Sequence, residues 1–465
     1  WMHYNSMPTG EFYDISIDQA DYTIYGGTQD DATVSGPAKE LNTRFPDPWN
    51  YVWIDAWDGG DGCVTAIDPV DKHIIYYSRQ HGDAMRLDKS TDVAVSIKPM
   101  LPREIKDTLV FNYMTPYFLS KYDHKTLYQG GNYLMKSTDR GDTWQAISPN
   151  LALSSVTEKK SVAAGTVVES PMAKGLLYVG TDHGAFWVSK NDGTTWEEHS
   201  TGIASNYIRS ISPSNHKIER VYMAMTGINY DDLHRYVYVS EDYGKNWKSI
   251  AAGLPDEPVN VIKEDPTNEN ILYAGTMRGV FVSLDRGVSW DYLGINMPAA
   301  AVADLEIHEG SQDLIVATHG RGIYKTNLKP LQKHLTQKLP DDKDYLDEIE
   351  QVSRPWFNSS HGNVDYRTLE KVSFTFWLKE AKEVTLSVRD SATQEVWSTV
   401  IDGSAGFNQF RWDLIVKKQE SDSPYFVHYD KFIDSGTYTL VLSTADGSMN
   451  QKFKVVDAIS PYIEN

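Results

Sequence analysis

Four aspartates near the start of the chain have the type and spacing that acid and base catalysis would need. Asp30 and Asp31 follow a Gly-rich strand, and Asp58 and Asp61 flank a Gly-Gly pair further along. Cleavage of a glycosidic bond uses two carboxyl groups, one protonated as the acid and one ionised as the base or nucleophile. One carboxyl group from each turn could form such a pair. The alternative is that these aspartates accept hydrogen bonds from amides of their own turns.

Other side chains could hold a ligand without catalysis. Trp53 and Trp57 have rings that could stack on sugars. The polar candidates, which lie in predicted turns and connections between strands, are His81, Asp182, His183, Arg209, Arg278, His319 and Arg321. The pair Asp182-His183 lacks convincing ligand spacing, so no metal is predicted. The sequence also contains no phosphate loop, serine elbow or nucleotide fingerprint, so no cofactor is predicted.

These candidates must be positioned by a repeat that runs through most of the chain. An apolar segment of the type Tyr-x-Gly recurs, and its equivalent positions are Tyr25, Tyr76, Tyr128, Tyr178, Tyr222, Tyr273 and Ile315. Their spacing of 42 to 52 residues fits a sheet of four short strands, as in one blade of a propeller. Seven copies predict an all-β ring of about seven blades.

Four of the repeats share a second motif, a turn of the form Ser-x-Asp-x-Gly-x-Thr-Trp. Its acidic or amide position and its closing tryptophan are Asp139 and Trp144, Asn191 and Trp196, Asp242 and Trp247, and Asp285 and Trp290. The carboxylate can accept hydrogen bonds from turn amides, the glycine permits positive φ, and the tryptophan can pack between blades. We therefore interpret these residues as structural.

This turn resembles the Asp-box of sialidases, sortilin-type receptor domains and xyloglucanase-type glycoside hydrolases. Nearly the whole chain resembles bacterial exported propellers of the sortilin-like or glycosyl-hydrolase-like kind, also known for their bacterial neuraminidase repeats. The resemblance implies a propeller with the second-to-third-strand turns and the blade connections on one face, around the channel, and the Asp-boxes on the other. We call the first of these the channel face. The Arg-Ile-Pro start of sialidases is absent, which disfavours that activity.

The last repeat ends without an outer strand, and Trp1 to Asn5 looks like the missing one. Pairing of the two would close the ring and remove a sheet edge. In the xyloglucanase-type enzymes the two acids sit on two propellers, so the resemblance implies that a hydrolase could need a second propeller upstream of residue 1, whereas a pair within this propeller would act alone. The alternative to a closed ring of seven blades is that the chain is the C-terminal part of a larger ring or of a tandem pair of propellers.

The pattern changes after Leu328. Residues 1–328 are predicted to form the propeller and residues 329–364 a linker. Residues 365–465 are predicted to form a β-sandwich, because alternation returns in Val372-x-Phe374-x-Phe376 and in later segments. The segments 406–413 and 435–442 resemble the immunoglobulin-like module that follows propellers in bacterial exported proteins.

Charge and composition narrow the function classes. The formal net charge is -20, which disfavours nucleic acid and anionic lipid as partners. The single cysteine, Cys63, excludes an internal disulfide framework, and no apolar run is long enough to span a membrane. We predict a secreted or cell-surface bacterial module that binds a glycan, a protein or a peptide on its channel face. Candidate protein partners include the N-terminal portion of the same protein and another exported subunit. The alternative function is a glycoside hydrolase.

Overall fold

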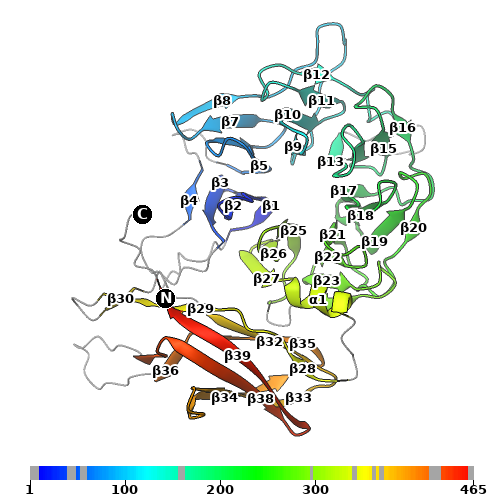
Figure 1. The fold of residues 1–465 in the computed structure, drawn as a ribbon. Helices are drawn as coiled ribbons and strands as arrows, with labels where there is room; N and C mark the ends of the chain where they lie inside the picture. The colour runs from blue at the N-terminus through cyan, green and yellow to red at the C-terminus, as the bar shows by residue number, and fades with distance from the viewer. Residues whose placement is uncertain are drawn as a thin grey trace. The chain divides into compact units, whose positions relative to one another are not determined.

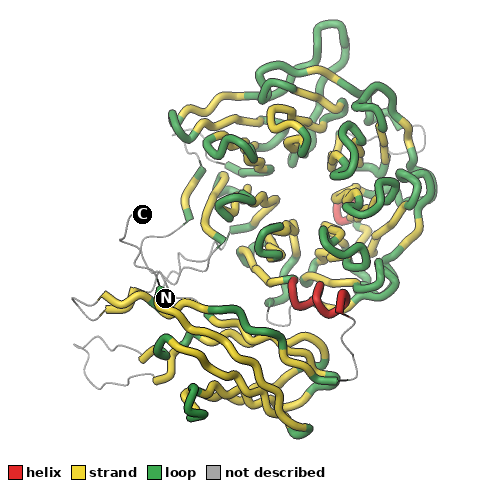
Figure 2. The backbone as a smooth tube through the Cα atoms, in the orientation of Figure 1, coloured by secondary structure: helices red, strands yellow, loops and turns green. Residues whose placement is uncertain are grey.

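The computed structural model describes residues 10–38, 49–52, 60–154, 163–293, 297–337, 343–358, 363–365, 371–417 and 431–458. Strands dominate these residues, and the helical elements among them are α1 (Lys329–Gln337) and the short 3-10 helix η1 (Ile228–Tyr230) (Figure 2). The chain divides into two compact units, and the boundary in sequence lies between Leu328 and Lys329.

Seven antiparallel sheets, each built from consecutive strands, follow one another around the first unit (Figure 1). The first three are β1 (Phe12–Ile17), β2 (Thr23–Thr28), β3 (Thr33–Pro37), β4 (Asn50–Tyr51); β5 (Thr65–Ile67), β6 (Ile74–Ser78), β7 (Ala84–Asp88), β8 (Val93–Ser96); and β9 (Tyr117–Ser120), β10 (Asp123–Gly130), β11 (Leu134–Ser137), β12 (Gln145–Ala146). The next two are β13 (Ala164–Glu169), β14 (Leu177–Thr181), β15 (Phe186–Ser189), β16 (Glu197–Glu198); and β17 (Tyr207–Pro213), β18 (Val221–Gly227), β19 (Asp232–Ser240), β20 (Lys248–Ser249). The last two are β21 (Val259–Glu264), β22 (Leu272–Thr276), β23 (Val280–Ser283), β24 (Asp291–Leu293); and β25 (Val302–His308), β26 (Asp313–Thr318), β27 (Ile323–Asn327).

The second strand of each sheet explains the Tyr-x-Gly repeat. These strands are covered on both faces by neighbouring sheets, and the repeat tyrosines are among the most deeply buried side chains of the chain. In four of the sheets a glycine stands two residues after the tyrosine and allows the next sheet to approach, and in the other three a serine or an alanine stands at the equivalent position. A Cβ atom at Gly180 would lie 2.3 Å from Cγ2 of Ile208, and one at Gly275 would lie 2.5 Å from Cγ1 of Val302. The residues of the repeat therefore form the contact between adjacent blades.

The first strands contact one another in turn around the centre, and β25 contacts β1. A shared core joins the last sheet to the first, with Phe12, Ile15 and Ile24 against Ile315 and Ala317. The ring of seven sheets is therefore closed by packing, and the predicted all-β propeller is confirmed. The predicted outer strand at Trp1 to Asn5 lies outside the described residues, and the last sheet has three strands among the residues that are described.

The second unit contains two larger sheets that share one core. The first sheet consists, in order, of β28 (Tyr345–Leu346), β32 (Val372–Leu378) and β35 (Gly406–Trp412). The second consists of β29 (Val352–Arg354), β39 (Gly447–Asp457), β38 (Gly436–Thr444), β33 (Lys382–Arg389) and β34 (Glu395–Gly403). Two short hairpins, β30 (Trp356–Asn358) with β31 (Asn363–Asp365) and β36 (Ile415–Lys417) with β37 (Lys431–Phe432), complete the described strands. Phe374 and Phe376 of one sheet belong to the same cluster as Leu386 and Leu440 of the other.

The segment that the sequence predicted to be a linker is in fact part of this unit. It contains α1, and it contributes β28 and β29, which pair with β32 and with β39. These strands have two and three residues, too few to show an alternating pattern in the sequence. The immunoglobulin-like classification remains a prediction.

Candidate functional site

Asp61 is the centre of a polar network on the channel face. Its side chain is buried, and Oδ1 accepts a hydrogen bond of 2.8 Å from the backbone amide of Asp30. Oδ2 accepts hydrogen bonds from the hydroxyl of Tyr13, at 3.0 Å, and from the hydroxyl of Tyr113. Tyr13 belongs to the first sheet, Asp61 precedes the second, and Tyr113 precedes the third. One carboxylate thus joins three blades.

The hydrogen bonds fix the ionisation of this group. Burial alone would raise the pKa of Asp61, but the bonds from Tyr113, the Asp30 amide and Tyr13 outweigh burial and hold the pKa below its usual value. Burial and the hydrogen bond to Asp61 raise the pKa of the Tyr13 hydroxyl. The hydrogen bond from Tyr113 to Asp61 likewise raises the pKa of the Tyr113 hydroxyl. At neutral pH the carboxylate is ionised and both phenols are protonated. Asp61 is therefore unsuited to act as an acid, and the tyrosines are unsuited to act as nucleophiles.

The network continues into the seventh sheet. The Gln29 amide nitrogen donates to both carboxylate oxygens of Glu11, at 2.8 and 2.9 Å, and to the Tyr13 hydroxyl at 3.3 Å. Glu11 Oε1 lies 2.9 Å from Nδ1 of His319. His319, a predicted ligand residue, is therefore connected to Asp61 through three intervening side chains.

Two of the predicted acids, Asp30 and Asp61, are joined by a hydrogen bond from a backbone amide, whereas catalysis would need two facing carboxyl groups. Asp30 is an exposed turn residue with φ of 58°, and it contacts Asp61 through its amide. Asp31 Oδ1 accepts a hydrogen bond of 2.9 Å from the hydroxyl of Tyr51. Asp58, Trp53 and Trp57 lie outside the described residues. Of the predicted acids, the structure thus connects Asp30 with Asp61, by a backbone bond.

Two tyrosine rings that the sequence analysis missed are held open to solvent beside these acids. Tyr51 is 49% exposed and Tyr113 is 45% exposed, although both hydroxyls are bound to aspartates. The ring of His81 meets that of Tyr113 edge to face, with 5.5 Å between centroids. Single tyrosines between motifs carry no sequence signal, because only the closed ring brings them next to Asp61 and Asp31.

The remaining predicted ligand residues are distributed around the ring. Asp182 Oδ1 lies 3.2 Å from Nδ1 of His183, and the Tyr230 hydroxyl donates to the Asp182 carbonyl at 3.0 Å. Arg278 is bound to Glu257 with 2.8 Å between Nε and Oε2. Arg321 is an exposed residue in the turn of the seventh sheet. These form separate groups and do not converge with Asp61.

Arg209 differs from its predicted place on the channel face. It lies on β17, one of the central strands, and Nη1 is 3.5 Å from Sδ of Met114. The charge of Arg209 acts on Asp14, which is also influenced by the charges of Asp304, Glu306 and Lys263 on the central strands. We call Asp14, Arg209, Lys263, Asp304 and Glu306 the channel cluster. It was not among the predicted sites, although charged residues at the alternate, less buried positions of β1, β21 and β25 were a usable signal.

Protonation within the channel cluster is unusual. Burial raises the pKa of Asp304 to about 6, with Lys263 opposing and Glu306 adding to the effect. Burial and the charges of Asp304 and Glu306 also raise the pKa of Asp14. Lys263 Nζ pairs with Glu306 Oε1 at 2.5 Å. Asp304 Oδ2 accepts a bond of 3.3 Å from the amide of Ile15, so the cluster sits where the ring closes.

These pKa values predict a pH dependence of stability. The folded protein binds a proton at Asp304 more tightly than the unfolded chain, so this stabilising contribution is lost as the pH rises from about 4 through about 6. Asp304→Asn removes the charge and keeps an oxygen that can accept the Ile15 amide bond. We expect the variant to gain stability relative to the wild type as the pH rises from 4 to 7. Urea unfolding at each pH measures the difference, and an unchanged difference across this range would contradict the assignment.

The Asp-box residues are occupied within their own turns. Oδ1 of Asp139, Asp242 and Asp285 accepts bonds of 2.8 to 2.9 Å from the amides of Thr143, Asn246 and Ser289. Asn191 accepts the equivalent bond from Thr195 at 2.9 Å. The indole nitrogens of Trp144, Trp196, Trp247 and Trp290 donate to carbonyls of the preceding blade, at Ile97, Ile147, His199 and Ile250. Trp290 is buried and the other three are half-buried.

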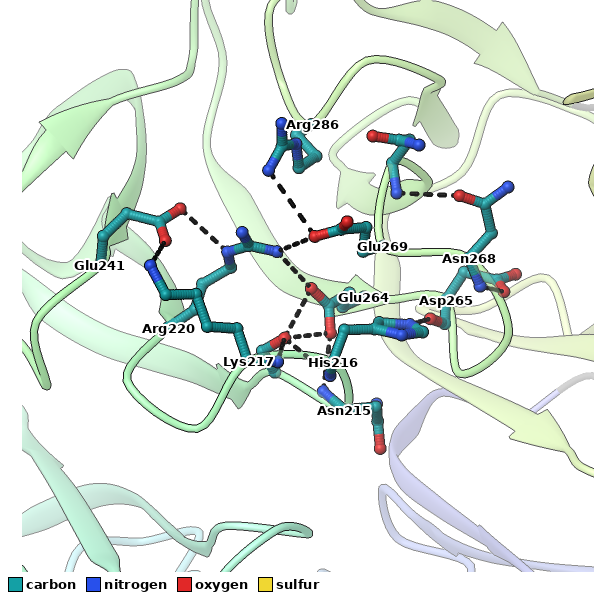
Figure 3. Close-up of polar contacts among 12 residues, drawn as sticks. Asn215, His216, Lys217, Arg220, Glu241, Glu264, Asp265, Asn268, Glu269 and Arg286 are labelled. Carbon is teal, nitrogen blue, oxygen red and sulfur yellow. Dashed lines mark hydrogen bonds and ion pairs between the residues drawn. The ribbon is translucent and has the colours of Figure 1, made fainter.

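A second dense polar group lies on the Asp-box side, between the fifth and sixth sheets (Figure 3). Arg220 is buried and pairs with Glu241 at 2.9 Å and with Glu269 at 2.9 Å, and Glu264 lies 3.6 Å away. Glu264 also accepts one bifurcated hydrogen bond from the Ser214 hydroxyl, with 2.7 and 2.9 Å to its two carboxylate oxygens. Because its buried members Arg220 and Glu264 pair across the two blades, we interpret the group as structural: it holds the fifth and sixth blades together, and we call it the lock between blades.

Within the described residues, no group of three or more His, Cys, Asp or Glu side chains is arranged to hold a metal ion. The helices that the structure describes also lack the length and apolar character required to cross a membrane.

Residues 235–433 match the Sortilin-Vps10 family, described as "Sortilin, neurotensin receptor 3". The match covers less than half of the chain, so it shows a likeness to that family. A comparison with curated protein sequences finds no match for the chain.

Solved structures similar to this chain include the GH74 xyloglucanase from Xanthomonas campestris, with 16% identity, a TM-score of 0.54, and coverage of 87% of this chain and 60% of that one. The extracellular domain of a hybrid two component system from B. thetaiotaomicron has 10% identity and a TM-score of 0.51 over 98% and 56% of the two chains. The GH74 enzyme of Niastella koreensis has 13% identity and a TM-score of 0.49 over 95% and 72%. The chain thus spans less than two thirds of the first two structures. At these identities the likeness to the first two structures, whose TM-scores are 0.54 and 0.51, establishes the fold.

Proposed function

We propose that the chain is a binding module that takes a neutral glycan at the mouth of the channel, around Asp61. The observation that carries the proposal is the pair of exposed tyrosine rings whose hydroxyls are fixed by aspartates. A ring held in place with its face open to water suits the apolar face of a sugar. Gln29 and His319 belong to the same polar network as Asp61, and Asp30 bonds Asp61 through its amide, so their polar groups could bond sugar hydroxyls.

The ionisation states favour binding over hydrolysis. A glycosidase needs one carboxylic acid that is protonated near neutral pH. The bonds to Asp61 lower its pKa instead, and Asp31 is bonded to Tyr51. The channel carboxyl groups Asp14 and Asp304 do have raised pKa values, so hydrolysis by the channel cluster is the second candidate function. We place the protein outside the cell or on its surface, in keeping with its resemblance to exported propellers.

Removal of the central carboxylate tests this proposal. Asp61→Ala frees the hydroxyls of Tyr13 and Tyr113 and loosens both rings, so we expect glycan affinity to fall by about tenfold or more. Calorimetric titration with a panel of neutral plant and bacterial polysaccharides, xyloglucan included, measures the affinity. Intact circular dichroism would show that the variant is folded.

A matched control is Asp242→Asn, in an Asp-box on the other side of the blade. Asn191 occupies the equivalent position naturally and accepts the same turn bond, so this variant should bind as the wild type does. Equal affinity of Asp61→Ala and Asp242→Asn for a bound glycan would contradict the site, and binding of peptides alone would replace the glycan as ligand.

A further inference from the structure

A hollow with a volume of about 670 Å³ lies in the connection between β8 and β9. Its volume is within the range of small-molecule sites. Its walls include the apolar residues Leu101, Ile105 and Phe111 and the basic residues His81, Lys98 and Arg103. His81 also contacts Tyr113, the partner of Asp61. The hollow therefore adjoins the candidate glycan site and has a different chemical character.

The hollow is built by a long connection that is firmly held. Strand β8 ends at Ser96 and β9 begins at Tyr117, and connections of this length without secondary structure are usually functional. The buried side chain of Asn132 accepts a bond of 2.8 Å from the Val110 amide and donates one of 2.9 Å to the Thr108 carbonyl. Because this wall is already ordered, a ligand that binds there would lose little affinity to the entropy cost of ordering the connection.

The one carboxylate of the lining is already engaged. Asp107 accepts bonds from the Tyr133 hydroxyl at 2.9 Å and from the Asn150 amide at 2.8 Å. The bond from the Thr108 amide, with these two, lowers the pKa of Asp107. Its charge therefore serves to hold the connection in place.

The basic residues of the hollow remain available. Lys98 and Arg103 are exposed, and neither forms an ion pair with any carboxylate in the part of the chain that the structure describes. The net charge of the protein is -20, so the long-range field repels anions. An anion would thus bind only where basic groups gather locally and can form charge-assisted hydrogen bonds.

We propose that the hollow binds an organic carboxylate carried on a ring with an apolar face. The carboxylate would pair with Lys98 and Arg103, and the ring would pack on Leu101, Ile105 and Phe111. The carboxylate has two sources with the same chemistry, an acidic sugar within a glycan or a free aromatic acid. The first source rests on the proposed function, because a glycan whose neutral part is bound at the Asp61 site would extend from there and place an acidic sugar in the hollow. The second does not depend on it.

The experiment compares Lys98→Gln/Arg103→Gln with the control Lys245→Gln/Lys248→Gln. The control removes two charges of the same sign from exposed residues on the Asp-box side. The probes are oligogalacturonate, neutral galactan oligosaccharides and 4-hydroxybenzoate, titrated at low and high salt. We expect the first variant to lose about tenfold or more in affinity for oligogalacturonate or for 4-hydroxybenzoate. The control should match the wild type, and the wild-type affinity should fall with salt.

The outcome separates the sources and the two proposals. Loss for oligogalacturonate with galactan binding retained indicates an acidic sugar, and loss for 4-hydroxybenzoate alone indicates a free acid. In Asp61→Ala, 4-hydroxybenzoate should bind as before, so the hollow can be tested even if the glycan site fails. If neither acid binds the wild type, or if both double variants bind alike, the proposal is overturned.

Discussion

Arg220→Met should lower the free energy of unfolding of the propeller by about 3 kcal/mol, the lower end of the range for breaking a buried ion pair. The substitution leaves Glu264, whose side chain has no exposed surface, without its cation. The lower end applies because Glu264 keeps its bonds from Ser214 and from the Asn215 amide. Urea unfolding, followed by tryptophan fluorescence, measures the change.

Lys217 provides the matched control for this experiment. Its ammonium group pairs with Glu241 at 2.8 Å in the same network, but its side chain is 43% exposed. Solvent screens such pairs, so Lys217→Met should cost less than about 1 kcal/mol. Similar losses for the two variants would show that the network is a surface feature and not a lock between blades.

Trp290→Ala should have an effect at least as large, about 3–5 kcal/mol, because it empties a large buried volume. The indole packs in a core with Leu272 and Ala274, and its nitrogen donates to the Ile250 carbonyl of the preceding blade at 2.8 Å. The loss should be visible as a lower urea midpoint for unfolding.

Tyr292→Ala is the control on the same blade. This tyrosine is 41% exposed and stands two residues from the tryptophan, so its removal should cost less than about 1 kcal/mol. A loss below about 1 kcal/mol for Trp290→Ala would contradict the interpretation of the Asp-box tryptophan as a contact between blades.

The fold was predictable because its contacts repeat. The buried tyrosines such as Tyr178, the glycines that follow them and the Asp-box tryptophans all serve contacts between neighbouring blades, so seven similar blades need similar residues. The linker prediction failed for the opposite reason. Leu346 and Val352 lie on strands that occur once and are too short for a periodic signal.

The site was predictable only in part. Asp61 and His319 stand beside recognisable turns, and the structure connects them. Tyr13, Tyr51 and Tyr113 are single residues, and their roles depend on bonds between blades that no local pattern encodes. Arg209 was assigned to a surface connection because the sequence does not show where its strand begins.

Hydrogen–deuterium exchange of the intact chain with and without a bound neutral glycan tests the central claim most directly. If the ligand binds at the channel mouth, backbone amides near Asp30, Asp61 and Tyr113 should exchange more slowly in the complex. Amides of the Asp-box turns at Asp139 and Asp242 should be unaffected. Protection at the Asp-box turns, with no change around Asp61, would contradict the proposed site.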